Sequence, residues 1–536
     1  MKAAWIRHRV LTAFLAITLI VFFSSGVFAE NEIHFSNHFS TTFNGVTGSG
    51  GDRSSLTEKI HYLNIFSLYG KGSMDDFDYN FKLSLKGTND ERNDIEELTL
   101  TSLQGRATNG IHTLTLGDTF ESFSKYSMGT VVKGGSYTYA DDDLPLPDLS
   151  LVYGYVYPRW DNFTSKVEAI ERKATGIRLQ QDLSPSTFVG CNYTRAWDRE
   201  SERVFSTDNV YDVTILSFDA ESRPIQGLIL SGEYAASRST TNIEEGADDI
   251  HARDSACKIS AIGYGGPSRV TLEYERVEPL FTTLLGSATP DREKVKTRWR
   301  YKYSRHVYTT LGFLWYRNHL SDDSEKTDRS DYFKPNVGLT LKRLFGRRYL
   351  VVDLASRLTR SYTSGRSTTD QFYNLNCRDR FFTLDSDTNL GYAIYDTNRD
   401  IRKDRDYMVN TSLSSRYTLG KVILKPNIYA GGQILKDELQ EIRDKTYEYS
   451  LGLGFDIPEF KITSNMKIGQ NRLEKETGDS SKKVFGNVSF YCQPAFLKKL
   501  NKGMLYVRGY VNDFNYTTTT RDFRETSITA GVRVRL

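Results

Sequence analysis

Four cationic side chains recur at every second position of one segment of the chain, 294–303. They are Lys296, Arg298, Arg300 and Lys302. Successive side chains of an extended strand point to opposite faces, so this spacing predicts a strand with one cationic face. A row of positive charges facing water attracts anions and repels cations. The chemistry that this segment predicts is therefore electrostatic selection of dissolved ions.

The segment that precedes it, 269–277, carries carboxylates in the same alternation. Glu273 and Glu275 share one predicted face, and apolar residues occupy the other. If the two segments form a hairpin, cross-strand neutralisation would stabilise the sheet, whereas uncompensated charge would line an aqueous path. Two carboxylates cannot neutralise four cations, and other neighbours can contribute charge. The sequence therefore leaves both interpretations open.

Glycines and charged residues punctuate the connection between two other predicted strands, near 111–118 and 128–140. The residues are Gly117, Asp118, Gly129, Lys133 and Gly134. The favoured interpretation is a bulged hairpin in which glycines absorb the bending of the strands. The alternative is a loop that folds inward. A phosphate-binding loop is excluded because the sequence contains no G-x-x-x-x-G-K-[ST] pattern.

Motifs for catalysis and metal binding are missing from the sequence. The histidines after residue 29 form no H-E-x-x-H pair, and no G-x-S-x-G nucleophile motif accompanies them. The four cysteines form no C-x-x-C pair. His34 and His38 share a strand face but lie about 13 Å apart, so polar surface residues are a better interpretation than metal ligands. We expect no enzyme activity, no metal site and no cofactor.

The elements that must position these residues are strands of unusual length. In 77–86 and in 447–457, apolar and polar residues alternate for about ten positions, which is the length of a tilted membrane-spanning strand. Soluble strands average five or six residues. The hydrophobic content of 38% and the negative mean hydropathy of −0.49 fit a membrane signal that is spread over alternating positions.

Similar runs follow one another from 33–43 to 526–536 and predict about 24 strands, within a range of 22 to 26. Short connectors such as 264–268, 343–349 and 458–460 alternate with long ones such as 238–253 and 278–293. This alternation predicts one antiparallel transmembrane β-barrel with both termini in the periplasm. Parity makes 361–406 either one long external loop that restricts the pore, which is the prediction adopted, or two further strands in a ring of 26.

The first 29 residues have the pattern of a secretory signal peptide. Basic residues precede an apolar run at 10–23, and Val27-Phe28-Ala29 resembles a cleavage site before Glu30. The alternative, a membrane anchor, needs about 20 apolar residues. Removing the signal peptide leaves 67 basic and 67 acidic residues, so no nucleic-acid partner is expected. The barrel is predicted to occupy 30–536.

The last predicted strand is amphipathic up to its final residue. Ile528, Ala530, Val532, Val534 and Leu536 occupy every second position. This resembles the C-terminal targeting strand of porin-like outer-membrane barrel proteins, although that family usually ends in Phe. The Gly-Asp and Lys-Gly elements near 117–134 are similar to those found near an inward loop in porin-like and usher-like barrels.

This resemblance implies export through the periplasm to the outer membrane of a Gram-negative-type bacterium. It also implies contact with the lipid bilayer, lipopolysaccharide and the barrel-assembly machinery. The function predicted is a channel for small polar or anionic solutes. Because so wide a barrel needs an obstruction, 361–406, the connector near 119–127 or a protein partner should narrow it. The alternative function is a scaffold, sheath or export channel for a partner protein.

Overall fold

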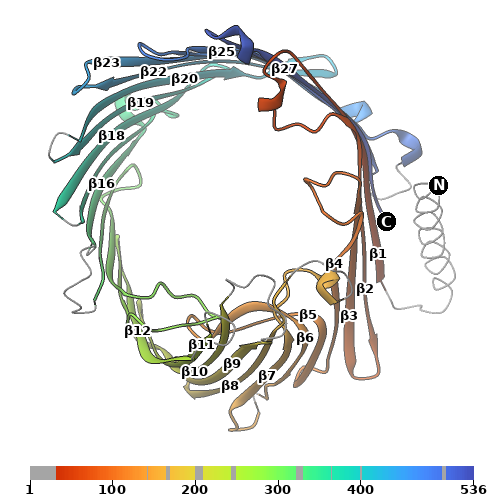
Figure 1. Ribbon diagram of the computed structural model, residues 1–536, viewed down its shortest axis with the longest axis vertical. Helices are drawn as coiled ribbons and strands as arrows, with labels where there is room; N and C mark the ends of the chain where they lie inside the picture. The colour runs from red at the N-terminus through yellow and green to blue at the C-terminus, as the bar shows by residue number, and fades with distance from the viewer. Residues whose placement is uncertain are drawn as a thin grey trace.

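The computed structural model describes residues 32–141, 143–163, 169–199, 209–242, 249–320, 330–363, 365–398, 401–497 and 503–536. The predicted signal peptide lies outside these ranges. Over the described residues the chain forms one antiparallel β-sheet that closes on itself around a wide lumen (Figure 1). Among those residues, no helix has the length and apolar character needed to cross a membrane.

Strands account for nearly all of the regular structure. The first half contains β1 (Glu32–Thr47), β2 (Lys59–Met74), β3 (Phe77–Thr88), β4 (Leu98–Thr108), β5 (His112–Ser124), β6 (Met128–Tyr139), β7 (Asp148–Tyr155), β8 (Arg172–Ser184), β9 (Thr187–Asp198), β10 (Val210–Ile225), β11 (Leu228–Asn242), β12 (Ile250–Gly265) and β13 (Ser268–Val277). The second half contains β14 (Arg292–Lys302), β15 (Val307–Asn318), β16 (Ser330–Lys342), β17 (Val351–Thr363), β18 (Arg366–Phe381), β19 (Leu384–Thr397), β20 (Arg402–Ser415), β21 (Tyr417–Leu419), β22 (Val422–Asp437), β23 (Ile442–Ile457), β24 (Ile462–Glu474), β25 (Ser481–Cys492), β26 (Met504–Tyr516) and β27 (Phe523–Arg535). Single 3-10 turns are η1 (Gly51–Arg53), η2 (Trp160–Phe163), η4 (Leu344–Gly346), η5 (Pro458–Phe460), η6 (Ala495–Leu497) and η7 (Thr519–Arg521).

The ring has 26 strand positions in the described part of the chain, because β21 continues β20 beyond Arg416 and pairs with the same neighbour, β22. Antiparallel pairing of β1 with β27 closes it, in a register that runs from Ser36 opposite Arg535 to Thr47 opposite Arg524. Phe35 and Leu536 extend this seam with two backbone hydrogen bonds of 3.1 and 2.8 Å. The count exceeds the predicted 24 by two.

Cross-strand register separates the side chains of each strand into two faces. On one face lie exposed large apolar residues, among them Phe43, Phe218, Tyr234, Ile259, Leu451 and Ile468. Paired residues of antiparallel strands share a face, and the registers place further apolar residues beside these on the neighbouring strands. An apolar outer band is what a lipid-facing barrel requires.

The prediction that 361–406 is one external loop is wrong. These residues form the end of β17, the hairpin of β18 and β19, and the start of β20. The physical reason is that the aromatic residues of this stretch pair across strands instead of folding into the mouth. Tyr373 stacks on Tyr392 with ring centroids 6.2 Å apart, and Phe372 packs edge-on against Tyr395 at 5.6 Å. The rival interpretation, two extra strands, is correct.

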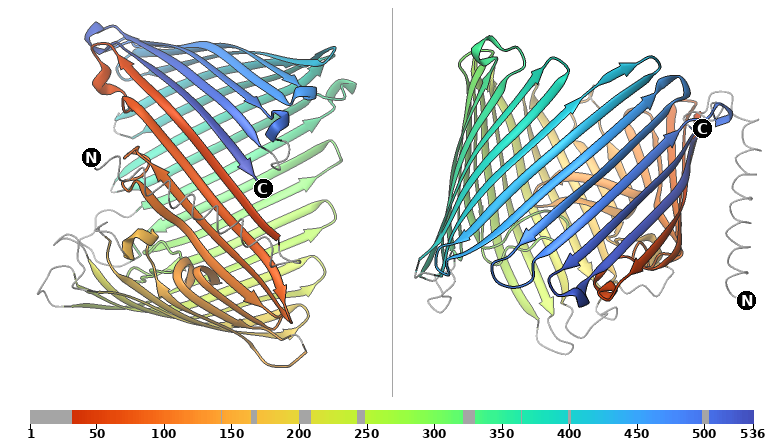
Figure 2. Two further views of the ribbon diagram at one scale, coloured as in Figure 1. Left: turned by 90° about the vertical axis from the view of Figure 1, so that its right-hand side faces the viewer. Right: turned by 90° about the horizontal axis from the view of Figure 1, so that it is seen from above.

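Connectors fall at two ends of the barrel, which we name by the chain termini. The terminal end holds Glu32, Leu536 and turns such as 75–76, 226–227 and 266–267, whereas the far end holds longer connectors such as 48–58 and 278–291. Figure 2 shows the strands tilted between these ends. The predicted alternation therefore holds for most connectors, although 125–127 and 438–441 are short turns at the far end.

Removing whole strands tests the corrected fold. Deletion of 366–397 removes β18 and β19 together and leaves β17 beside an antiparallel β20, so we expect a folded, heat-modifiable barrel of lower thermal stability. Deletion of 366–383 removes β18 and its turn, which would leave β17 beside a parallel β19 without a crossover connection. We expect that variant not to assemble. Normal assembly of the one-strand deletion, measured by heat-modifiable mobility, would contradict the 26-strand ring.

Candidate functional site: an inward hairpin and a charged lumen wall

The hairpin of β5 and β6 leaves the barrel wall at Gly117. β4 and β5 pair only where 104–108 of β4 faces 113–117 of β5. Gly117 has a φ of +100°, and a Cβ added there would lie 2.2 Å from the carbonyl oxygen of Leu103. Glycine is therefore required at this bend, because other residues would be strained and would clash with β4. Beyond it the hairpin folds over the inner face of the neighbouring strands (Figure 1).

Apolar packing holds the hairpin against the wall. Phe123, Met128 and Val132 are at most 5% exposed and contact small residues of the wall, Ala174 and Ala196 among them. Burying each large side chain contributes about 1.5–3 kcal/mol. The wall residues are small where the hairpin lies over them, so its backbone can approach closely.

A second apolar cluster forms at the tip of the hairpin. Tyr126 is fully buried and packs edge-on against Phe281 of the connector 278–291, with ring centroids 5.7 Å apart. Both rings lie over small or aliphatic inner residues of β10–β13, including Ala235 and Ala256. The hairpin tip is thus enclosed between the wall and the connector 278–291.

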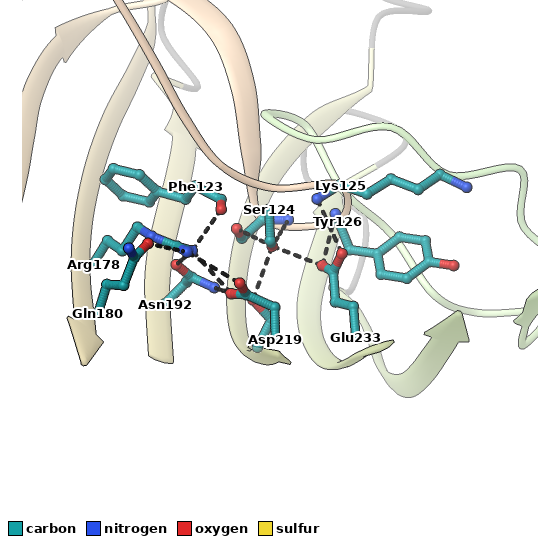
Figure 3. Close-up of polar contacts among 11 residues, drawn as sticks. Phe123, Ser124, Lys125, Tyr126, Arg178, Gln180, Asn192, Asp219 and Glu233 are labelled. Atoms are coloured by element: carbon teal, nitrogen blue, oxygen red, sulfur yellow. Dashed lines mark hydrogen bonds and ion pairs between the residues drawn. The ribbon is translucent and has the colours of Figure 1, made fainter. Parts of the chain in front are cut away.

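Glu233 of β11 anchors the backbone of the turn. Its carboxylate accepts hydrogen bonds from the Ser124 hydroxyl at 2.6 Å and from the backbone N–H groups of Lys125 and Tyr126, each at 3.0 Å (Figure 3). All three donors lie at the tight turn of the hairpin, and the Ser124 hydroxyl also contacts the hydroxyls of Ser127 and Ser217. Hydrogen bonds to a charged acceptor are stronger than neutral ones, so Glu233 fixes the position of the turn.

Arg178 of β8 forms a second anchor beside the first. It donates to both carboxylate oxygens of Asp219, at 2.9 and 3.0 Å, and to the side-chain oxygen of Asn192 at 2.7 Å. The same guanidinium donates to the backbone carbonyl of Phe123 at 2.5 Å. Figure 3 shows this group directly beneath the hairpin backbone. A guanidinium that is held by a carboxylate on one side can thus bind the turn on the other.

A chain of alternating charges continues from the tip of the hairpin into the wall. Lys125 forms an ion pair with Glu275, which also pairs with Lys294. Lys294 lies 3.0 Å from Glu273, whose other oxygen is 3.5 Å from Lys258. Two carboxylates thus hold three ammonium groups beneath and beside the hairpin tip.

The segment 156–163 fills the place in the wall that the hairpin leaves. Asp118 forms an ion pair with Lys133 at 2.9 Å and accepts a hydrogen bond from the Trp160 indole at 3.2 Å. Arg159 lies 2.6 Å from Asp94 of the connector between β3 and β4. Burial acts to raise the pKa of Asp94, but hydrogen bonds from Arg159 and its neighbours outweigh it, and the pKa falls below its ordinary value. Asp94 is thereby held as a carboxylate beside its cation.

The predicted row of cations lies on the face of β14 that points into the lumen. Lys296, Arg298, Arg300 and Lys302 have the same parity as Lys294, which meets the hairpin network on the inner face. All four side chains are exposed. Within the described part of the chain none of them is in an ion pair. Trp299 has the opposite parity and is 41% exposed on the outer face.

The two predicted carboxylates do not neutralise that row. Glu273 and Glu275 lie on the same face as the cations, opposite Lys296 and Lys294 respectively. Their ion-pair partners, however, are Lys294, Lys258 and Lys125, three lysines that the sequence interpretation did not include. Within the part that the structure describes, the four cations of β14 therefore face the lumen uncompensated.

The glycine motif spans the base and one arm of the hairpin. Asp118 pairs with Lys133 at the base, Gly134 has no room for a Cβ beside Tyr153, and the Gly129 N–H donates to the Leu285 carbonyl at 2.8 Å. Sequence reasoning missed the anchors, which are Glu233, Arg178, Asp219 and Asn192. The sequence did signal the docking surface itself, because Val213 and Ile215 interrupt the face of β10 that is polar at Ser217 and Asp219.

Two further observations concern possible metal ligands and the cysteines. Among the described residues no cluster of three or more His, Cys, Asp or Glu side chains has the geometry to hold a metal ion. Cys191, Cys257, Cys377 and Cys492 are all free thiols.

No protein-family model matches the chain, and no curated protein does. Among solved structures, the P pilus usher (PapC) translocation pore matches 94% of this chain and 99% of its own, with 12% identity and a TM-score of 0.35. OpdQ from Pseudomonas aeruginosa matches 95% of this chain and 98% of its own, with 10% identity and a TM-score of 0.27. OccD1 (OprD) matches 68% and 96%, with 9% identity and a TM-score of 0.34.

Removal of the Glu233 anchor should release the hairpin. In Glu233→Ala, two backbone donors and one hydroxyl lose a charged acceptor, which should destabilise docking by roughly 2–5 kcal/mol. Hydrogen exchange at residues 119–131 should then accelerate while the barrel strands stay protected. Asp212→Ala is the control, because it removes a carboxylate from the 41–46% exposed pair with Arg195 and should leave the hairpin protected. Unchanged exchange in Glu233→Ala would show that the remaining contacts hold the turn without Glu233.

Proposed function

We propose that this chain is an outer-membrane, porin-like channel that passes small polar or anionic solutes. The observation that carries the proposal is the row of four uncompensated cations on the inner face of β14. Charged side chains that line a water-filled barrel set its ion preference. The lipid-facing apolar band and the closed ring supply the membrane environment in which such a row acts.

The position of the row supports a role in guiding solutes. β14 begins at the far end, where Lys294 meets the hairpin network, and ends at Lys302 near the terminal end. The cations therefore extend from the level of the hairpin tip along the wall. An anion that passes the hairpin would remain beside positive charge as it moves along β14 toward the terminal end.

The hairpin narrows the lumen from one side and does not fill it (Figure 1). A ring of this many strands, spaced about 4.8 Å apart and tilted by about 40°, is roughly 50 Å across between backbones. Inner side chains reduce that width to roughly 40 Å. A passage of this size would admit a small folded domain, whose radius of gyration is about 13 Å.

This width favours a second candidate function, in which the barrel is a scaffold, sheath or export channel around a partner protein. The two functions separate on purification. A barrel built around a partner would co-purify with it in a fixed ratio and conduct little in that state, whereas a solute channel would conduct as a purified single chain in a planar bilayer.

Charge reversal of the β14 row tests the channel. Replacing Lys296, Arg298, Arg300 and Lys302 together by Glu should reverse the sign of the zero-current potential in a salt gradient, because the lumen field would then favour cations. The barrel should still fold, since these side chains point into water.

Trp299, on the outer face of β14, provides a control for which face of the strand points to lipid. Trp299→Lys places a charge in lipid and should cost roughly 2–4 kcal/mol if the position lies near mid-membrane, without changing selectivity. If Trp299→Lys and the fourfold Glu variant were equally stable, the assignment of the two faces of β14 would be wrong. An unchanged zero-current potential in the Glu variant would refute the proposed role of the row.

The proposal places the barrel in the outer membrane with both termini in the periplasm, after export and insertion by the barrel-assembly machinery, in contact with lipopolysaccharide outside. Cysteine labelling of intact cells checks this topology in a background where the native cysteines are replaced by Ala. Leu439→Cys and Lys475→Cys, at the far end, should react with a membrane-impermeant maleimide. Phe345→Cys and Phe382→Cys, at the terminal end and 91% and 101% exposed, should react only after lysis. The reverse labelling pattern would show that the barrel has the opposite orientation in the membrane.

A further inference from the structure

A hollow of about 760 Å³ lies on the inner wall at the terminal end of the seam, among β1, β2, β3 and β27. We name it the seam pocket. It is separate from the β14 row, because β1 and β14 lie thirteen strands apart in either direction around the described ring. It also lies outside the hairpin network, which involves β5–β14.

Cross-strand register explains why the wall is hollow here. Arg535, Ser36, Ser67 and Ser84 form one row across four strands. The three serines are short, and the Ser84 hydroxyl donates to the Ser67 hydroxyl at 3.0 Å. Larger side chains occupy the rows on either side, so Ser36 and Ser67 form a floor between two rims.

The rims carry aromatic and cationic groups. On one side His34, Tyr69 and Lys82 stand in register, and the rings of His34 and Tyr69 stack with centroids 6.1 Å apart. On the other side Arg533 stands opposite His38, whose ring is 2.6 Å from the Tyr506 hydroxyl. Residues four apart on a strand are separated by about 13 Å, which sets the distance between the rims.

The charge of the pocket is strongly unbalanced. Four cations line it, Lys71, Lys82, Arg533 and Arg535, against one carboxylate, Glu32. Lys71 pairs with Glu32 at 2.9 Å on the exposed rim. Lys82, Arg533 and Arg535 have no ion-pair partner among the described residues.

We propose that the seam pocket binds a small solute that bears several oxyanion charges, a phosphate ester or a polycarboxylate. Guanidinium groups bind carboxylate and phosphate in a fixed two-pronged geometry. The ammonium of Lys82 adds a mobile positive charge, and the serine floor supplies hydroxyl donors. The volume is that of a small-molecule site. This site deepens the proposed preference for anions, but it binds its ligand whether or not the barrel conducts.

Equilibrium binding to the folded, detergent-solubilised barrel tests the site without measuring transport. Isothermal titration uses two probes, inorganic pyrophosphate and citrate, at low ionic strength. We expect saturable binding of at least one of them, weakened by added sodium chloride because salt screens the exposed cations. Binding of pyrophosphate alone identifies a phosphate site, and binding of citrate alone identifies a carboxylate site. Comparable binding of both identifies a site that recognises negative charge without distinguishing the two groups.

Variants then locate the binding. Arg533→Gln with Arg535→Gln should weaken binding at least tenfold. Lys82→Gln, which lies on β3 and leaves the closing strand β27 intact, should weaken it severalfold and tests the site even if the arginine variant does not assemble. The matched control, Lys467→Gln with Lys483→Gln, removes two inner-face cations of β24 and β25 that lie outside both the seam pocket and the β14 row, and it should retain wild-type affinity. Absence of binding by both probes, or an equal loss of affinity in the control, overturns the proposal. If the wild-type barrel binds the probes but shows no ion selectivity in a bilayer, the channel proposal is refuted and the proposed binding site is retained.

Discussion

The constraint on which the structure depends is that every backbone N–H and C=O group at membrane depth needs a partner within the protein. A sheet meets that requirement only if it has no free edge, so the first and last strands must pair. Closure fixes two further properties of the chain. Antiparallel neighbours around a closed ring demand an even number of strands, and each strand must present one face to lipid and the other to the lumen.

The hairpin of β5 and β6 is the place where the wall departs from this rule. When β5 bends away at Gly117, part of the edge of β4 loses its partner strand. The departure is tolerated because 156–163 covers that edge and Asp118 accepts the Leu103 N–H at 2.8 Å. The hairpin gains in return a buried apolar face and a set of charged anchors. The strands beneath it therefore have small apolar residues where other lumen faces are polar.

The class of fold could be predicted from the sequence because period-two alternation and closure act on every strand. The faces of 294–303 follow from the same alternation, which assigns Arg298 and Trp299 to opposite sides. The number of strands was harder to predict from the sequence. The many polar residues of 361–406 obscured the alternation of Tyr373 and Tyr392, since both faces of β18 and β19 carry aromatic rings. The anchors Glu233 and Arg178 could not be found by pattern, because a carboxylate or guanidinium facing the lumen is expected on any strand.

Seam closure also has a consequence for the timing of biogenesis. In the export that we propose for this chain, β1 leaves the secretion machinery before the other strands, and its partner β27 follows only after nearly the entire barrel. Throughout that interval β1 exposes an unpaired edge, which is an open template for pairing with other chains. The strand pairing with the largest sequence separation is thus also the one that protects the fold from aggregation. A periplasmic factor that shields the edge of β1 would matter more for the yield of this protein than the intrinsic stability of any single hairpin.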